Sequence, residues 1–181
     1  MVRVGVVLAG CGAQDGAEIH ESVFTLLALD RAGAKAIIMA PDMDQFYVIN
    51  HLDSSKMDTT RNILSEAARI ARGDIVSIGS INSDDLDALI FPGGTGMAKN
   101  IFDYANSGAD CRVIKDVDVL TRKVINDNKP IGAICIAPVM IAKILQNMGK
   151  RGRVTGGLDE KISSDMESMG MITEKVDARG I

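Results

Sequence analysis

Short apolar runs alternate along this chain with segments of helical periodicity, and this alternation constrains the fold more than any other feature. The run "VRVGVVLAG" at 2–10 has no polar position after Arg3, as in a strand buried on both faces. Further strands are predicted at 35–40, 74–81, 88–91 and 131–134, and helices at 16–32, 60–73, 96–105, 116–129 and 137–148. The pattern favours an α/β fold, a mostly parallel sheet with helices on both faces.

Three further expectations concern packing and connections. In the helix at 16–32, the stripe Ile19, Val23, Leu26 and Leu27 is expected to face the core. Residues 41–60 lack periodicity and are long for a connection, which favours a functional loop or lid. The end of the chain predicts a strand at 152–157, a helix at 160–170 and a last strand at 171–177.

Length and composition limit the class of protein. With 181 residues, of which 46% are hydrophobic, we expect one domain over 1–181 with a single core. "KVDARGI" closes the last strand with no helix behind it, so a final element is expected to be missing. The net charge is −4 and no segment concentrates Lys and Arg, so we expect no nucleic-acid partner.

Location is inferred from what the chain lacks. No apolar run approaches the ~20 residues of a membrane helix, and the start is too short for a signal peptide, so no membrane partner is expected. Cys11, Cys111 and Cys135 are an odd set without a C-x-x-C motif. This argues against a disulfide framework or a zinc site, and for a reducing compartment. We therefore expect a cytoplasmic protein.

A cysteine marks the hinge between a predicted strand, Ile131–Ile134, and the helix that follows. In "GAICIAPVM" at 132–140, Cys135 comes directly after the apolar run, and Pro138 suits a first helical turn. A nucleophile elbow has this arrangement, and the helix start would stabilise a thiolate. We predict a reactive Cys135 that titrates well below about 8.5. A buried structural cysteine fits the same pattern.

Two glycines follow the central strand in "FPGGTG" at 91–96. They let the backbone turn tightly and point N–H groups inward, where such groups could hold a developing oxyanion. An ordinary turn explains the same residues. Because sites in parallel sheets form at the carboxyl ends of strands, the turns after Gly10, Phe91 and Ile134 are expected to open on one edge, from neighbouring strands.

The third turn is "CGAQDGAEIHES" at 11–22. Its glycines resemble a loose dinucleotide signal, which we discount because Asp15, Glu18 and Glu21 would crowd a pyrophosphate. Glu21 lies beside a partly apolar helix face, where desolvation would favour a protonated carboxyl that can move protons. A solvated acid near a helix start is the alternative. Of the two histidines, His20 is predicted at the surface and His51 in the long loop.

Taken together, these motifs resemble a known family. "GCGAQDGAEIHESV", "APDMDQFYVINH", "TRNILSEAARIARG", "LIFPGGTGMAKN" and "KPIGAICIAPVM" resemble the enhancing lycopene biosynthesis (ElbB) proteins. These are also called isoprenoid biosynthesis proteins with an amidotransferase-like domain, in the PfpI-type, class I glutamine amidotransferase-like superfamily. The resemblance runs from about Val4 to Val176. It implies a flavodoxin-like α/β sandwich and a homodimer.

The resemblance also implies roles for single residues. It makes Cys135 the elbow nucleophile and Glu21 its carboxyl partner, the amides of Gly94 and Ile136 the oxyanion donors, and Glu18 and Gly93 supporting residues. The chain departs from the pattern at Gly157, near which several relatives carry a histidine, and at Gln14, where members often have an aromatic residue. Most members also continue for a few dozen residues beyond Ile181.

The function implied by the resemblance is that of a cofactor-free, metal-free glyoxalase, which converts glyoxal to glycolate. We expect small 2-oxoaldehydes in general to give the hydroxy acid through a cysteine hemithioacetal. The substrate is expected to be a small aldehyde in a tight pocket with little apolar lining. A non-catalytic redox sensor or regulatory protein that uses Cys135 as an oxidisable thiol is the alternative. A glutaminase or peptidase is less favoured, because a glutaminase normally needs a histidine base.

Overall fold

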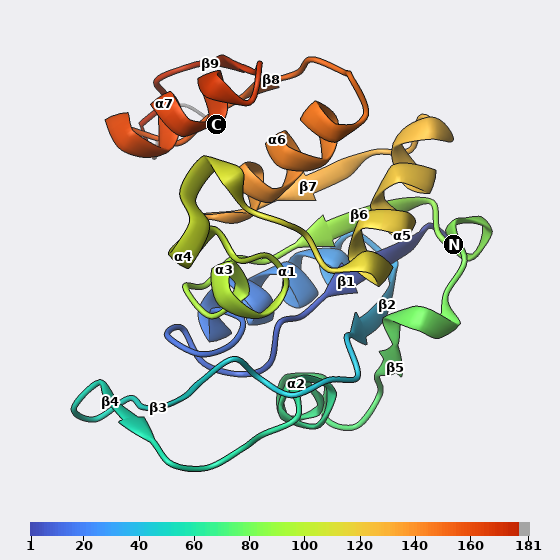
Figure 1. Ribbon diagram of the computed structural model, residues 1–181. Helices are drawn as coiled ribbons and strands as arrows, with labels where there is room; N and C mark the ends of the chain where they lie inside the picture. The colour runs from blue at the N-terminus through green and yellow to red at the C-terminus, as the bar shows by residue number, and fades with distance from the viewer. Residues whose placement is uncertain (178–181) are drawn as a thin grey trace.

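Five parallel strands form the central sheet of the computed structural model, in the order β5-β2-β1-β6-β7 (Figure 1). The strands are β1 (Arg3–Val7), β2 (Lys35–Ala40), β5 (Val76–Ser77), β6 (Ala88–Phe91) and β7 (Ile131–Ala133). The structure describes residues 1–177; the expectation that the fold is unfinished after "KVDARGI" rests partly on 178–181, outside the described residues. The predicted α/β fold with a mostly parallel sheet is confirmed.

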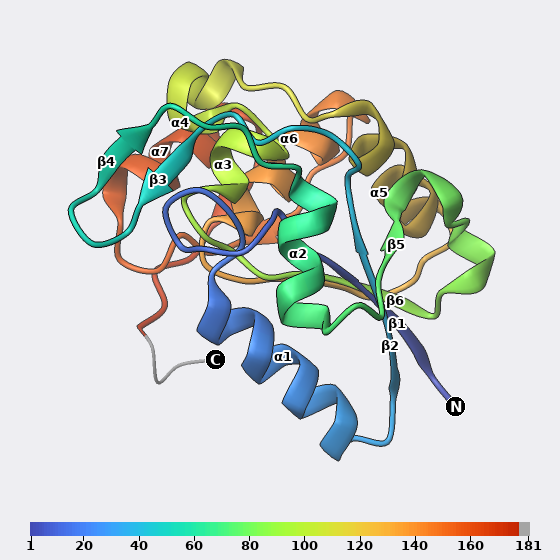
Figure 2. The same ribbon diagram turned by 90° about the horizontal axis from the view of Figure 1, so that it is seen from below.

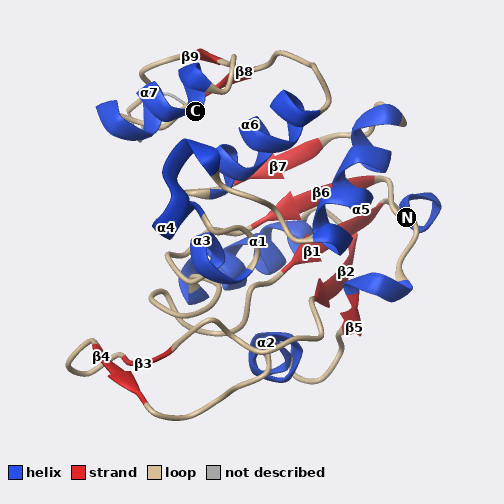
Figure 3. Ribbon diagram, in the orientation of Figure 1, coloured by secondary structure: helices blue, strands red, loops and turns tan. Residues whose placement is uncertain are grey.

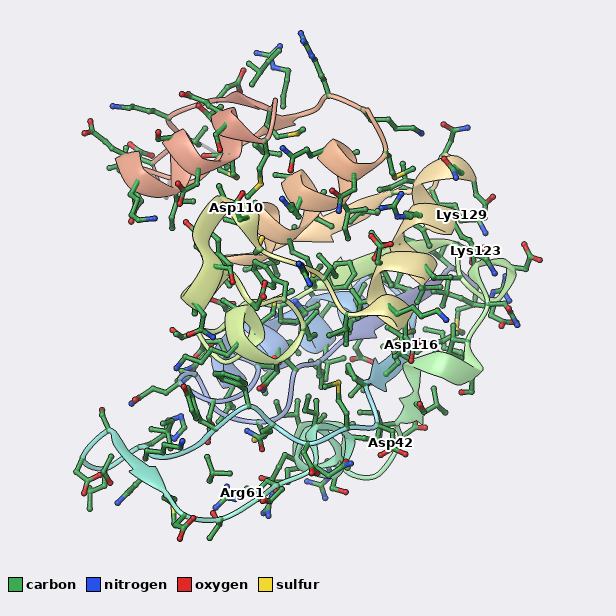
Figure 4. All side chains as sticks on the ribbon, in the orientation of Figure 1. Asp42, Arg61, Asp110, Asp116, Lys123 and Lys129 are labelled. Carbon is green, nitrogen blue, oxygen red and sulfur yellow. The ribbon has the colours of Figure 1, made fainter. Side chains whose placement is uncertain are left out.

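Helices cover both faces of the sheet, as Figures 2 and 3 show. On one face, α1 (Ile19–Arg31) and α2 (Ile63–Ala71) lie beside each other against β2. On the other face, α5 (Lys115–Asn126) packs on β6, and α6 (Ala137–Asn147) packs on β7 and α5. Figure 4 shows Asp116 and Lys123 of α5, and Arg61 ahead of α2, whose side chains are exposed.

The apolar run at the start of the chain is buried as predicted. Val6 and Leu8 are fully buried, and β1 pairs with β2 on one side and β6 on the other. The core continues through Met39, Leu89 and Phe91. A central parallel strand needs apolar residues on both faces, which explains the unbroken run.

The apolar stripe predicted to anchor α1 faces the other way. Leu26 is partly buried, but Ile19, Val23 and Leu27 are exposed. Ser22 and Thr25 are buried instead. Helical spacing shows which residues share a face of the helix, but it does not show whether that face points to the core or to solvent. Hydrogen bonds between the first turn of α1 and the turn after β6 set the orientation of the helix. The prediction that this stripe faces the core is therefore wrong.

The long segment at 41–60 is not structureless. It contains a short antiparallel hairpin of β3 (Val48–Asn50) and β4 (Ser55–Met57), which projects from the body in Figure 1. The three-residue strands are too short to show a period of two in the sequence.

The helix predicted at 96–105 is two short helices, α3 (Met97–Asn100) and α4 (Tyr104–Ser107). Phe102 leaves the helical path to form a bridge with Val113, and the Asp103 carboxylate accepts the Arg112 N–H at 2.5 Å. These contacts with residues that follow later in the sequence interrupt the helix between Asn100 and Tyr104. Single 3-10 turns lie at Ile78–Ser80, Ser83–Asp85 and Gly108–Asp110.

The last elements form a small unit beside α6. β8 (Arg153–Val154) and β9 (Ile172–Thr173) pair in parallel around α7 (Glu160–Ser168). They make a separate two-stranded sheet that does not extend the central one. Among the helices of residues 1–177, none combines the length and the apolar character needed to cross a membrane.

Candidate active site

Three turns meet at the carboxyl edge of the sheet. β1, β6 and β7 are adjacent and parallel, so the segments that follow them leave on the same side. This confirms the prediction that the turns after Gly10, Phe91 and Ile134 open on one edge. Residues far apart in the sequence therefore come together around Cys135.

Cys135 lies on a strained turn between β7 and α6. Its φ is +58°, a conformation that residues other than glycine rarely adopt. Ile136 caps α6, and Pro138 lies in the first turn of that helix. The turn exposes the Cys135 side chain above the sheet edge. The geometry is that of a nucleophile elbow, in which strain presents the side chain.

The glycines after β6 let two backbone segments touch. A Cβ at Gly96 would lie 1.8 Å from the Gly16 nitrogen, and one at Gly94 would lie 2.6 Å from the Glu18 nitrogen. Gly94 also has a φ of +111°. The Thr95 N–H donates to the Ala13 carbonyl at 2.7 Å. This close approach brings the "FPGG" turn and the start of α1 together beside Cys135.

Glu18 and Glu21 are held by that contact. The Glu18 N–H donates to the Gly93 carbonyl at 2.9 Å, and the Gly93 N–H donates to Glu21 Oε2 at 2.7 Å. Glu18 also caps α1, because its Oε2 accepts the Glu21 N–H at 2.8 Å. Burial opposes the charged form of Glu18, but hydrogen bonds from Glu21 and His20 keep its pKa below its ordinary value. These hydrogen bonds fix the positions of the Glu18 and Glu21 carboxylates beside Gly93.

Desolvation and three neighbouring groups determine the pKa of the Cys135 thiol. Although the residue is exposed at the surface, the protein around the sulfur partly desolvates it, and this raises its pKa most, whereas the Gly94 N–H lowers it. The Glu21 carboxylate raises the pKa through its charge and its hydrogen bond, and the Ile136 N–H lowers it. The net effect is upward, so the prediction of a lowered thiol pKa is wrong. The N–H donors of Gly94, in the turn after β6, and of Ile136, at the start of α6, do not outweigh desolvation and a neighbouring carboxylate.

The expected contact between Glu21 and Cys135 is present. A Cβ at Gly93 would lie 2.5 Å from Cys135 Cβ and 2.9 Å from Glu21 Oε2, so both side chains border the same point. A thiol, a carboxylate and two N–H donors therefore converge. These are the groups that covalent addition to a carbonyl requires: a nucleophile, a base and oxyanion donors.

Two hollows flank Cys135. One, of about 480 Å³, is lined largely by small and apolar residues that include Pro138, Gly157, Leu158 and Val176. The other, of about 290 Å³, is lined by Ala98, Tyr104 and Ile136 among others. The expectation of a tight pocket with little apolar lining is therefore wrong. Residues from α4 and from the segment after β8 form the walls, and their meeting depends on tertiary packing.

Tyr104 is a wall residue that the sequence did not single out. Its hydroxyl donates to Asp165 Oδ2 at 2.6 Å, which joins α4 to α7. Burial, followed by the Asp165 carboxylate, raises the Tyr104 pKa. The partners lie 61 residues apart, so no local pattern could have indicated the pair.

Asn100 is a second residue that sequence reasoning missed. It is buried, and its Nδ2 donates to the carbonyls of Ala9 at 3.0 Å and Asp15 at 2.9 Å. Its Oδ1 accepts the Phe46 N–H at 2.9 Å. The Gln45 amide also donates to the Asp15 carbonyl. Asn100 thus holds the loop after β1 in place from the opposite side.

Both histidines have partners other than the thiol. His20 Nδ1 lies 3.1 Å from Glu18 Oε1 with an exposed ring, as predicted for a surface residue. His51 Nε2 accepts the Gln14 N–H at 3.2 Å and lies 3.7 Å from Asp15 Oδ1. His51 therefore fastens the β3–β4 hairpin to the loop after β1. At Gly157, near which the family resemblance implies a histidine in other members, a glycine with φ of +65° borders the larger hollow.

Within 1–177, no three His, Cys, Asp or Glu side chains are grouped so that they could hold a metal ion. In the turn after β1, the Asp15 carboxylate accepts the Ile49 N–H at 2.8 Å and faces His51. The acidic residues of this turn are thus engaged within the protein.

Comparison with known proteins gives a family and several relatives. The DJ-1/PfpI family pattern matches residues 11–175. The chain is 46% identical over 147 residues to the Homo sapiens "Glutamine amidotransferase-like class 1 domain-containing protein 3, mitochondrial". It is 45% identical over 147 residues to the Rattus norvegicus "ES1 protein homolog, mitochondrial". Each match covers 81% of this chain and 55% of the relative, so the chain spans little more than half the length of these relatives.

A solved structure supports the same fold. An isoprenoid biosynthesis protein with an amidotransferase-like domain from Ehrlichia chaffeensis superposes with a TM-score of 0.88 at 34% identity. The match covers 97% of this chain and 80% of that one. The flavodoxin-like, class I glutamine amidotransferase-like fold is therefore shown.

The expectation of a cytoplasmic protein is contradicted by these comparisons. The human and rat relatives are both named as mitochondrial proteins. Unpaired cysteines indicate a reducing compartment, and that argument does not single out the cytoplasm. The cysteine content therefore supports a reducing compartment but does not support the cytoplasm in particular.

Proposed function

The chain belongs to the DJ-1/PfpI family, which includes proteases and glyoxalases, and from this we propose that it is a cysteine-dependent, glyoxalase-like lyase. The observation that carries the proposal is the convergence of the Glu21 carboxylate and the Gly94 and Ile136 N–H groups on Cys135. We further propose that it belongs to the ElbB group, which the likeness to the Ehrlichia chaffeensis protein supports.

The first step is addition of the thiol to an aldehyde. Because its pKa is raised, Cys135 needs a base, and Glu21 takes the thiol proton as the sulfur attacks the first carbon of glyoxal. The carbonyl π electrons move to oxygen, where the Gly94 and Ile136 N–H groups hold the charge. Such donors can contribute about 3 kcal/mol each. Return of the proton to that oxygen gives a hemithioacetal and frees the Glu21 carboxylate.

The second step moves a hydrogen between the two carbons. Glu21 removes the proton from the first carbon, and the electron pair of that C–H bond forms a C=C bond as the second carbonyl becomes an enediolate. Glu21 then delivers this proton to the second carbon, while the hydroxyl proton on the first carbon's oxygen passes to the oxygen of the second carbon. The first carbon is oxidised to a thioester and the second is reduced to an alcohol, so no external oxidant or reductant is needed. Water cleaves the thioester, releasing glycolate and the Cys135 thiol.

The substrate class follows from the hollows beside Cys135. The larger one has room for more than two carbons and has an apolar wall that includes Pro138 and Leu158. This supports 2-oxoaldehydes with a small apolar substituent, such as methylglyoxal, as proposed substrates beside glyoxal.

The competing functions have weaker support. Oxidation-sensing cysteines depend on thiolate character, and the raised pKa of Cys135 works against it. A glutaminase needs a histidine base, whereas His20 and His51 are engaged by Glu18, Gln14 and Asp15. No observation favours either function over the lyase.

A direct assay tests the proposal. Purified protein is incubated separately with glyoxal, methylglyoxal and glutamine, and glycolate, lactate and glutamate are measured. We expect hydroxy acids but no glutamate, with turnover abolished in Cys135→Ser and largely kept in the matched variants Cys11→Ser and Cys111→Ser. Chelator treatment is expected to leave the rate unchanged. Full turnover by Cys135→Ser, or its loss after chelation, would refute the mechanism.

A further inference from the structure

The two hollows beside Cys135 are separate spaces. Among the described residues, Cys135 alone lines both of them. The larger hollow runs along the start of α6 and the segment after β8, whereas the smaller one lies between α3, α4 and Ile136. An acyl group on the Cys135 sulfur can therefore extend into one hollow while a second reactant reaches the same carbon from the other.

Cleavage of a thioester on Cys135 needs such a second reactant. A water oxygen adds to the thioester carbon, the C–S bond breaks, and one proton of the water ends on the Cys135 sulfur. The substituent of the acyl group has its place in the larger hollow, against Pro138 and Leu158. The smaller hollow is then the space left for water, and it borders Ile136, whose N–H reaches the sulfur.

Tyr104 brings a hydroxyl group of fixed direction to the smaller hollow. The hydroxyl donates its proton to Asp165 Oδ2 at 2.6 Å, so its oxygen can only accept from a further partner. Lys161 Nζ lies 2.7 Å from the same Asp165 oxygen and holds it in place. Burial, followed by the Asp165 carboxylate, raises the pKa of Tyr104, so the proton stays in that bond. Tyr104 is therefore suited to accept a hydrogen bond from water.

Thr95 brings the second hydroxyl group of this hollow. Its N–H donates to the Ala13 carbonyl at 2.7 Å, which fixes the backbone directly after Gly94. Thr95 is exposed, and its hydroxyl can both donate and accept. Apart from the thiol, the other walls are the apolar residues Ala98, Ala105 and Ile136. The polar side chains of the smaller hollow thus converge on a water-sized part of it.

We propose that the hydroxyls of Thr95 and Tyr104 bind the water that cleaves an acyl group from Cys135. The water donates one O–H to the Tyr104 oxygen and accepts the Thr95 O–H, which leaves a lone pair for the acyl carbon. Buried waters commonly make about three polar contacts, and these two with the acyl group complete that number. Asp165 is a positioning residue that acts through Tyr104. For its natural acyl group, this inference rests on the proposed function.

Reaction with p-nitrophenyl acetate isolates this step from the lyase chemistry. The Cys135 sulfur displaces p-nitrophenolate in a burst, its thiol proton passes to solvent, and water then releases acetate at the steady-state rate. The experiment uses a Cys11→Ser, Cys111→Ser background, in which Cys135 is the remaining thiol.

Two substitutions remove the hydroxyls and keep the shape of the side chains. We expect Tyr104→Phe to slow the steady-state rate about 10-fold, the value of one hydrogen bond, and to leave the burst rate unchanged. Adding Thr95→Val should slow it about 100-fold in all. Mass spectrometry should then find Cys135 acetylated in both variants, and circular dichroism checks that they are folded.

Conservative variants separate a hydrogen-bonding role from a structural one. Thr95→Ser keeps the hydroxyl, Asp165→Asn keeps an oxygen that accepts the Tyr104 proton, and Tyr47→Phe makes the same change at the other tyrosine. All three should release acetate at the wild-type rate. Asp165→Ala should resemble Tyr104→Phe and add nothing to it when the two are combined, because both changes act on one bond.

Three results would overturn the proposal. These are a wild-type steady-state rate in the Thr95→Val, Tyr104→Phe variant, equal slowing of the burst and the steady state, and a wild-type Cys135 that p-nitrophenyl acetate does not acylate. Glycolate formation from glyoxal is measured separately. Its absence beside the expected acetate kinetics would refute the lyase alone, so the two proposals fail separately.

Discussion

The Gly93 N–H donates to Glu21 Oε2 at 2.7 Å, joining two residues that lie 72 positions apart. This bond places the Glu21 carboxylate at the thiol of Cys135, and only glycine at position 93 leaves room for both side chains. The relationship explains why the turn after β6 and the first turn of α1 must be built together.

A methyl group at position 93 should therefore disable the site. In Gly93→Ala, the new Cβ would lie 2.5 Å from Cys135 Cβ and 2.8 Å from the Ile134 carbonyl oxygen, which forces the elbow to move. We expect glyoxalase activity to fall by more than about 100-fold and stability by about 1–3 kcal/mol. Gly79→Ala, where the nearest atom would be 3.6 Å away, is the control. Activity assays and urea unfolding measure both effects, and an active Gly93→Ala would refute the packing argument.

The titration of Cys135 should follow from its neighbours. Burial and Glu21 raise its pKa, so the thiolate fraction stays small at neutral pH and rises only as pH passes the ordinary thiol value. In a Cys11→Ser, Cys111→Ser background, the rate of alkylation by iodoacetamide should therefore rise on the alkaline side. Glu21→Gln removes the repelling charge and should move the midpoint to lower pH. A wild-type midpoint below ~8.5, or one unmoved by Glu21→Gln, would count against this account.

The three cysteines should differ in accessibility. Cys135 is exposed, Cys11 is half-buried and Cys111 is fully buried. Burial raises the pKa of Cys111 to about 11, so both access and thiolate content oppose its reaction. At pH 8, peptide mass spectrometry should find Cys135 alkylated first, Cys11 more slowly, and Cys111 only after denaturation. Early modification of Cys111 in folded protein would contradict the packing of the core.

Removing Asn100 should destabilise the loop after β1. In Asn100→Ala, the Ala9 carbonyl and the Phe46 N–H lose their side-chain partner within the protein interior. Unsatisfied buried groups of this kind should cost about 3 kcal/mol in total. Asn106→Ala, at an exposed position of α4, should be nearly neutral. Urea unfolding compares the two, and equal stability would show that water replaces the Asn100 amide.

A charge in the wall of the larger hollow should alter substrate preference. Leu158→Asp places a carboxylate where an apolar substituent would lie. We expect kcat/KM for methylglyoxal to fall about 10-fold more than that for glyoxal, since one methyl group in a pocket is worth about 1–3 kcal/mol. Leu52→Asp, at the exposed tip of the β3–β4 hairpin, is the control. Equal effects on both substrates would exclude this wall as a specificity element.

The sheet and the elbow could be predicted because their signals are local. The run before Gly10 is apolar on both faces of a strand, and Cys135 stands between an apolar run and a helix that has Pro138 in its first turn. The parallel order then brings the turns together by topology alone. What sequence reasoning missed depends on distant partners, such as Tyr104 with Asp165 and Asn100 with the loop after β1.

Two errors have a common physical origin. The stripe of α1 was expected to face the core, and the thiol of Cys135 was expected to be acidic. Both inferences used a single helix and ignored what packs against it. The direction of α1 follows from Glu18 and Gly93, and the thiol pKa follows from burial and Glu21.

Glu21 is the group that moves protons in the proposed turnover, and conversion of glyoxal by Glu21→Gln tests this role directly. The variant keeps an amide oxygen that can accept the Gly93 N–H, so the frame around Cys135 should persist while the base is lost. We predict that glycolate release falls by at least about 100-fold, because proton transfer from the thiol and proton transfer between the two carbons both lose their base. Glycolate release by Glu21→Gln at the wild-type rate would contradict the proposed mechanism.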